Sequence, residues 1–207
     1  VLETLDSFSS LTGTDLTVAG VAVTTFWHNI LGIGADDQPV TPLISWADTR
    51  PASVMDRLRS DIDEKRNHAR TGCVLHPSYF PAKLRWFAAE CPSEFRSSRY
   101  WMSIGEYLLF RLFGVRGCSV SMASGTGLLN VHDCTWDSEL LAHLHLDPAD
   151  LSEIIDMDTS FRGLVPEFSN RWPCLKDVPW WPALGDGACS NIGSGCVAAD
   201  RTAIMVG

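Results

Sequence analysis

An apolar run at residues 18–26 constrains the fold more than any other feature of this chain. The run reads Val-Ala-Gly-Val-Ala-Val-Thr-Thr-Phe, and such small and β-branched residues are typical of a buried strand. Before it, Leu2, Leu5 and Phe8 recur at every third position, which favours a short helix, and residues 12–15 read as a turn. A helix, a turn and a buried strand in this order predict an α/β protein.

Further elements follow from periodicity and turn residues. We expect strands and helices at these ranges: strands at 30–34, 43–46 and 100–102, and helices at 52–70, 82–91 and 104–113. Ser103 and Glu106, three positions apart, predict a capping box at the start of the last of these helices. Gly114 is expected to end it.

Two candidate substrate contacts, Trp27 and His28, come directly after the first buried strand. In open α/β sheets, ligand sites gather beyond the carboxyl ends of strands, so both residues are reasonable contacts. The equally weighted alternative is that they pack against the next strand. Asp48 and Arg50 could touch a polyol, or could equally be a helix cap and a surface charge.

A glycine-rich stretch at residues 184–195 holds a single carboxylate, Asp186, among four glycines. Glycines allow close approach of the backbone to a ligand, and small neighbours leave the carboxylate little steric cover. We therefore interpret Asp186 as a general base that takes a proton from a substrate hydroxyl. The alternative is a plain strand-to-helix turn in which Asp186 is the N-cap.

Composition narrows the class of partner. The formal net charge of −9 argues against nucleic acid, because phosphate binding needs clustered Lys and Arg. No apolar run is long enough to span a membrane. The seven cysteines are irregularly spaced without a C-x-x-C pair, which favours buried free thiols in a cytoplasmic protein and no metal site. The chain starts at Val1 and stops in a strand-like run at 202–207, so we expect a segment of a longer protein.

Five segments, taken in chain order, resemble the N-terminal domain of the FGGY family of carbohydrate kinases, with the gluconokinase and xylulokinase branch nearest. They are the strand and loop at 21–28, W-x-D-x-R at 46–50, T-G at 71–72 with K-x-x-W at 83–86, S-x-A-S-x-T at 121–126, and G-D-x-A at 185–188. The resemblance implies the actin-like ATPase, RNase H-like fold, of which this chain is the first domain, truncated at both ends. Residues 1–183 would belong to the sugar-binding domain. Residues 184–207 would carry the catalytic turn and begin the ATP-binding domain.

The resemblance also implies roles for individual residues. Asp186 would be the catalytic base, Trp27 and His28 would line the sugar, and Trp46 and Asp48 would lie nearby. ATP and Mg²⁺ would bind mostly outside this segment. The expected partner is a small-molecule sugar or sugar acid, with gluconate or xylulose foremost. Neither nucleic acid nor a membrane is expected as a partner, and the protein could form a homodimer.

The chain departs from the family pattern in two ways. Phe26-Trp27 stands where the family usually has Gln-Met or Gln-Arg, which changes the polarity of the sugar loop. The D-x-G-T-type and T-S-G-like phosphate turns are absent, so this segment alone is not expected to transfer phosphate. Two alternatives are a non-catalytic sugar-sensing module and a hydrolase using Asp186 and His28, which lacks an identified nucleophile or metal site.

Overall fold

The structure, a computed structural model, describes residues 1–11 and 17–204. The turn expected at 12–15 and the last residues of the run at 202–207 lie outside these ranges, and residues 202–204 are not in a strand. The helices are α1 (Leu2–Leu11), α2 (Met55–Asp61), α3 (Glu64–Thr71), α4 (Phe80–Glu90), α5 (Pro92–Ser97), α6 (Ile104–Phe113), α7 (Val120–Ser124), α8 (Ser138–Leu144), α9 (Pro166–Arg171) and α10 (Asp186–Gly193), with short 3-10 helices η1 (Arg50–Val54), η2 (Pro148–Asp150) and η3 (Pro173–Leu175).

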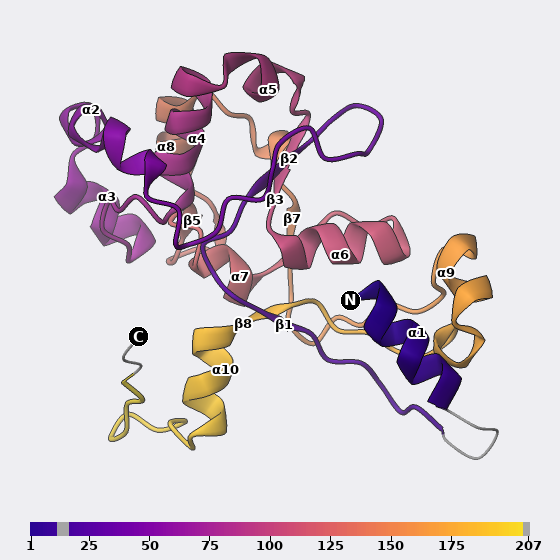
Figure 1. Cartoon of the computed structure of the whole chain (residues 1–207). Coiled ribbons are helices and arrows are strands. Elements are labelled where there is room, and N and C mark those ends of the chain that lie inside the picture. Colours follow the sequence, from indigo (N-terminus) through magenta and orange to yellow (C-terminus); the bar gives the residue numbers. More distant parts are fainter. Residues whose placement is uncertain (12–16, 205–207) are drawn as a thin grey trace.

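Short strands pair two by two among the described residues (Figure 1). The parallel pairs are β1 (Thr24–Thr25) with β8 (Leu184–Gly185), and β4 (Gly117–Ser119) with β7 (Glu153–Ile155); the antiparallel pairs are β2 (Leu31–Ile33) with β3 (Tyr100–Met102), and β5 (Leu129–Asn130) with β6 (Thr135–Trp136). Parallel pairs joined through helices confirm the expected mixture of α and β structure.

The strand expected at 18–26 is shorter than its apolar run suggests. Only Thr24 and Thr25 form the paired strand β1, and Val21 makes an isolated parallel bridge to Trp180. The partner segment contains Pro179 and Pro182, which have no N–H to donate to a ladder. Backbone hydrogen bonds remain around them, from Val21 N to the Pro179 carbonyl (2.9 Å), from Trp181 N to the Val21 carbonyl (3.0 Å) and from Leu184 N to the Val23 carbonyl (3.0 Å). The prolines therefore divide one extended pairing into two short pieces.

The single helix expected over 52–70 is wrong, because the end of η1 and two separate α-helices, α2 and α3, occupy that range. Ile62 is extended, with φ −124° and ψ 126°, and it ends α2. The next residue, Asp63, accepts a hydrogen bond from Arg66 N at 3.1 Å and so caps α3. An aspartate that satisfies the first free N–H groups of a helix favours a fresh start over continuation.

Other local predictions are confirmed. Strands form at 31–33 and 100–102, and helices at 80–90 and 104–113, within two residues of their expected bounds. At α6, Ser103 N donates to Glu106 Oε2 (2.7 Å), and Glu106 N donates to Ser103 Oγ (3.3 Å), which completes the capping box. Gly114 ends the helix with φ +70°. The expected strand at 43–46 is reduced to a bridge between Ile30 and Ile44.

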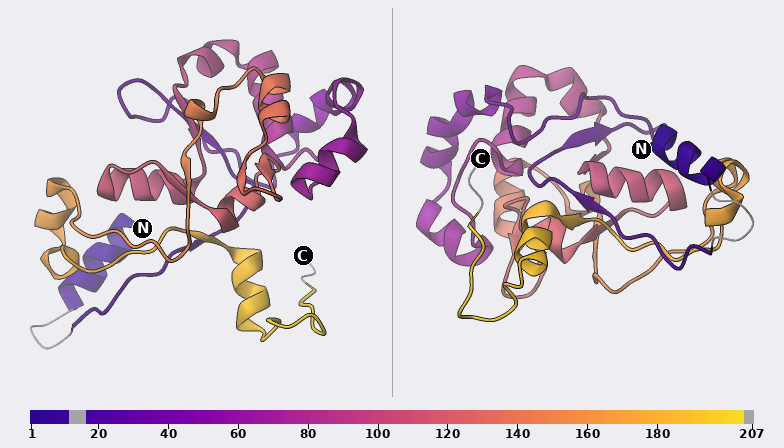
Figure 2. Two further views of the ribbon diagram at one scale, coloured as in Figure 1. Left: turned by 180° about the vertical axis from the view of Figure 1, so that it is seen from behind. Right: turned by 60° about the horizontal axis from the view of Figure 1, so that its bottom comes forward.

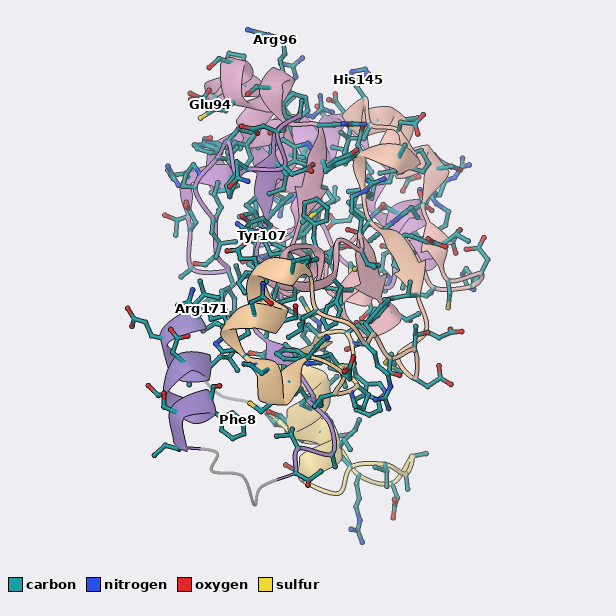
Figure 3. All side chains as sticks on the ribbon, turned by 90° about the vertical axis from the view of Figure 1, so that its right-hand side faces the viewer. Phe8, Glu94, Arg96, Tyr107, His145 and Arg171 are labelled. Carbon is teal, nitrogen blue, oxygen red and sulfur yellow. The ribbon has the colours of Figure 1, made fainter. Side chains whose placement is uncertain are left out.

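Two main apolar cores are formed by separate groups of elements, which Figures 1 and 2 show at different ends of the molecule. The larger core joins α2, α4 and α8, with Leu58, Phe87 and Leu140 among its buried side chains. The smaller core lies at α6 and α9 and includes Trp172. Helix α1 attaches to it through Asp6, which accepts from Arg171 Nη2 (2.6 Å) and Trp172 Nε1 (2.9 Å). Figure 3 shows Arg171 beside α1, far from Glu94 and Arg96 on α5.

Two further expectations concern membrane spans and the burial of the cysteine thiols. No helix within 1–11 and 17–204 is long and apolar enough to cross a membrane. The expectation of buried thiols is wrong for six of the seven cysteines: Cys118 is buried, Cys134 is exposed and the others are partly exposed. The predicted boundary between residues 183 and 184 stays a prediction.

Candidate functional site

The carboxylate of Asp186 lies at the start of α10, immediately after β8. Gly185 is the N-cap, so the alternative in which Asp186 itself caps the helix is wrong by one residue. Asp186 Oδ1 accepts from Gly187 N (2.9 Å) and from Trp27 N (3.4 Å), while the residue as a whole is exposed. The positive end of the helix dipole favours a carboxylate at this position. One oxygen is therefore fixed by two backbone groups, at the edge of solvent.

The indole of Trp27 joins three segments that are far apart in the chain. Its Nε1 donates to the Ser121 carbonyl at 2.9 Å. Its ring covers two glycines so closely that a Cβ on Gly185 would lie 1.9 Å from Nε1, and one on Gly125 would lie 2.5 Å from Cδ1. Gly185 N in turn donates to Ser121 Oγ at 3.1 Å. Trp27 therefore packs against two distant glycine segments and lies next to Asp186, and its role as a substrate contact stays a prediction.

His28 is held in an unusual backbone conformation beside Trp27. Its φ is +59°, a region that residues other than glycine seldom adopt. Its Nδ1 lies 2.6 Å from the Gly125 carbonyl oxygen, and its ring meets Tyr79 edge-on with 4.7 Å between centroids. Burial lowers the pKa of His28, and the nearby charge of Lys83 lowers it further, against the raising effects of the Gly125 carbonyl and the Asp186 carboxylate. His28 is thus a half-buried imidazole within electrostatic reach of Asp186.

Lys83 on α4 binds the backbone of this loop, a role that was not predicted from the sequence. The side chain is fully buried, and its Nζ donates to the His28 carbonyl and, at 3.5 Å, to the Ile44 carbonyl. Burial lowers the pKa of Lys83 to about 8. A lysine on an otherwise apolar helix face (Phe80, Leu84, Phe87) was the signal that could have indicated a buried role.

Asp48 and Trp46 lie on the neighbouring loop in different environments. The Asp48 carboxylate forms a bidentate ion pair with Arg50, with Nε–Oδ1 3.0 Å and Nη2–Oδ2 2.5 Å. These hydrogen bonds lower the pKa of Asp48. The Arg50 guanidinium stacks over Trp86, 4.6 Å from the ring centroid. Trp46 is 60% exposed, and its carbonyl accepts from Ser78 Oγ at 3.1 Å.

The five residues expected from the sequence thus form one direct group and one attached group. Trp27, His28 and Asp186 lie together through backbone and electrostatic contacts. The loop with Trp46 and Asp48 is joined to them indirectly, because Lys83 binds both His28 and Ile44, and Ser78 precedes the Tyr79 ring that meets His28. The W-x-D-x-R and K-x-x-W segments therefore meet in space, through Arg50 and Trp86.

A cavity lies apart from this site, and the arrangement of possible metal ligands is a separate feature. An apolar cavity of about 550 Å³ lies between α1, residues 21–25 and α6, and its lining includes none of the five residues. Within the described ranges, no group of three or more His, Cys, Asp and Glu side chains could hold a metal ion. By their side-chain chemistry, Asp186 can accept a proton and His28 can form hydrogen bonds.

Comparisons with known proteins match nearly the whole chain. The sequence profile of the FGGY family of carbohydrate kinases, N-terminal domain, matches residues 6–193. The gluconokinase of Bacillus subtilis (strain 168) is 25% identical over 190 residues, covering 92% of this chain and 37% of the relative. A glycerol kinase of Rhodopseudomonas palustris is 32% identical over 165 residues, covering 77% of this chain and 32% of the relative.

Solved structures agree with the profile. The crystal structure of gluconate kinase from Lactobacillus acidophilus superimposes with a TM-score of 0.87 at 27% identity, covering 94% of this chain and 39% of that one. The expected actin-like fold is confirmed, and the chain corresponds to the first domain only. It spans little more than a third of the length of its relatives.

Proposed function

The chain belongs to the FGGY family of carbohydrate kinases, and from this premise we propose that it supplies the sugar site and catalytic base of an ATP-dependent kinase. The acceptor is a hydroxyl of a sugar, sugar acid or polyol, with gluconate or xylulose foremost. The similarity to gluconokinases supports a sugar acid, and the similarity to a glycerol kinase supports the wider polyol class.

The observation that carries the proposal is the position of Asp186. Its Oδ1 is fixed by Gly187 N and Trp27 N, and no hydrogen bond to Oδ2 is found from the described residues. An anchored carboxylate with one open oxygen can take the proton of an alcohol as that alcohol attacks phosphorus. An alkyl hydroxyl is a poor nucleophile, so a base positioned within hydrogen-bond reach contributes to the rate.

The neighbouring residues take the substrate-binding roles. His28 and Trp27 would line the sugar next to the base. Trp46 offers an exposed ring for the apolar face of a sugar. Asp48 would act through its oxygen lone pairs while Arg50 holds it in place. Aligning a hydroxyl against a base replaces an encounter in solution by a fixed geometry, which lowers the entropic part of the barrier.

Family membership implies ATP and a divalent metal, whose charge would neutralise the phosphates when bound. In this proposal those groups are held mostly by parts of the polypeptide outside residues 1–207, and the chain described here aims the acceptor. The homodimer stays a prediction.

A phosphorylation screen of the complete protein tests the proposal. ADP release is measured with ketopentoses, hexonates and polyols, and binding of each compound is measured by calorimetry. We expect turnover with at least one compound of these classes. Binding without any ADP release would contradict the kinase proposal and favour the alternative, a non-catalytic sugar-sensing module.

A further inference from the structure

The ring of His28 is fixed in one tautomer by its only hydrogen bond among the described residues. Its Nδ1 lies 2.6 Å from the Gly125 carbonyl oxygen, which can only accept. Nδ1 must therefore carry the hydrogen, and in the neutral ring Nε2 then carries a lone pair. Gly125 itself is held by the Trp27 indole and by its N–H bond to the Met122 carbonyl (3.2 Å), so the acceptor is rigidly placed.

The other ring nitrogen, Nε2, is open to the surroundings. No hydrogen bond to Nε2 is found from residues 1–11 or 17–204. It is also not among the buried side-chain polar atoms that lack a partner in those ranges, which lie on Asn67, Arg85, Ser152 and Trp180. An unpartnered nitrogen that is not buried is accessible, so His28 presents Nε2 to an approaching molecule.

Nearby positively charged groups oppose protonation of the His28 ring. The Lys83 ammonium on α4 donates to the His28 carbonyl, and His76 lies on the same aromatic cluster through Tyr79. Asp186 on α10 is a carboxylate, and its negative charge favours the imidazolium. Burial, Lys83 and His76 together outweigh Asp186 and the Gly125 carbonyl, so the pKa of His28 lies below its ordinary value. The neutral form of the ring is therefore favoured over the imidazolium at pH 7.

We infer that His28 is a fixed hydrogen-bond acceptor, and that the substrate group at its Nε2 is a hydroxyl and not a carboxylate. A hydroxyl donates to a lone pair, whereas a carboxylate offers only lone pairs and would need an N–H. A sugar acid would then bind with its carboxylate away from His28. This inference rests on the proposed function, since it specifies which part of the substrate occupies that same site.

The tautomer can be tested without any ligand. Nitrogen-15 NMR of histidine-labelled protein at pH 7.5 distinguishes a protonated Nδ1 from a protonated Nε2. We expect the Nδ1–H form for His28, and the Nε2–H form for His132, whose Nε2 lies 2.9 Å from the Ala69 carbonyl oxygen. Finding the Nε2–H form or the imidazolium at this pH would overturn the inference, whatever the protein phosphorylates.

The substrate contact is tested by the shift of the His28 pKa on binding. Gluconate and glucitol form a matched pair, because they differ only in a terminal carboxylate or hydroxymethyl group. A ligand that prefers the neutral ring tenfold lowers the His28 pKa by about one unit at saturation. We expect the His28 pKa to fall with whichever compound binds. A rise of this pKa with gluconate would overturn the inference and leave the proposed function untouched.

Calorimetry on the same samples separates this inference from the proposed function. If a compound binds and no His28 resonance moves, both the placement of the sugar at His28 and the inference are overturned. A Lys83→Met variant adds a control on the cause, because loss of the neighbouring ammonium is expected to raise the His28 pKa. The wild-type measurements decide the question even if this variant does not fold.

Discussion

Asp186 is the residue on which turnover is expected to depend most. In Asp186→Asn, the amide oxygen can still accept from Gly187 N and Trp27 N, so the local fold is kept. The amide cannot take a proton, and we expect kcat to fall by roughly 100- to 10,000-fold with little change in the sugar Kd. Steady-state kinetics and calorimetry on the complete protein measure the two quantities.

The control for this variant is Asp200→Asn, which changes an exposed carboxylate in the segment after α10. It is expected to leave both kcat and Kd unchanged. Equal losses of binding and turnover in Asp186→Asn would show that the carboxylate is a binding contact and not a base.

At the scale of elements, the junction of β8 and α10 depends on the absence of a side chain at Gly185. A Cβ there would lie 1.9 Å from Trp27 Nε1, and the indole is held by its bond to the Ser121 carbonyl. We expect Gly185→Ala to lower the free energy of unfolding by about 1–3 kcal/mol, the usual cost of overpacking. Urea denaturation followed by tryptophan fluorescence measures it.

Two companion variants make this prediction specific. Gly193→Ala, at the other end of α10, would meet nothing within 4 Å and is expected to be neutral or slightly stabilising. In a Trp27→Ala background, the cost of Gly185→Ala should largely vanish, because the clashing ring is gone. An unchanged cost in that background would mean that the glycine is needed for another reason.

The attachment of α1 to α9 is expected to be acid-sensitive. Hydrogen bonds from Arg171, and then from Trp172, lower the pKa of Asp6 to about 2 from an ordinary value of 3.8. A carboxyl with a depressed folded-state pKa stabilises the fold fully above about pH 4 and loses that contribution as the pH falls towards 2. The difference in urea midpoint between wild type and Asp6→Asn should therefore be constant above pH 4 and shrink below it.

Asp158→Asn, in the exposed turn after β7, serves as the matched control, and its midpoint should follow the wild type at every pH. A wild-type advantage over Asp6→Asn that persists unchanged to pH 2 would show that the Arg171 contact does not govern this attachment.

For the whole molecule, binding and phosphoryl transfer are expected to separate. The chain matches an N-terminal domain and spans 37% of the length of a gluconokinase. Phosphoryl transfer requires the phosphate charge to be neutralised as well as the acceptor to be aligned. We expect residues 1–207 alone to bind the substrate without releasing ADP, as calorimetry and a coupled ADP assay would show. Sugar-stimulated ADP release by this chain alone would contradict the division of labour proposed here.

The sequence by itself determined the local elements and the candidate base. The capping box of Ser103 and Glu106, the helix stop at Gly114 and the strand at 100–102 all depend on neighbours a few residues apart, so their signals are local. Asp186 could be singled out for the same reason, because it is the lone carboxylate in a glycine-rich turn. The break at Asp63 was missed although its signal, an aspartate that caps a new helix, was also local.

Only the tertiary structure decided how the site is assembled. Lys83 binds the carbonyl of His28 across 55 positions, and Trp27 N reaches Asp186 across 159. The glycine at 185 is required by an indole from the other end of the chain, and the acceptor that fixes the His28 ring comes from Gly125. No local pattern encodes such contacts, because they arise only when burial of separate apolar segments brings the backbones together. The sequence shows which residue types are present, whereas the packed fold determines which hydrogen bonds they form.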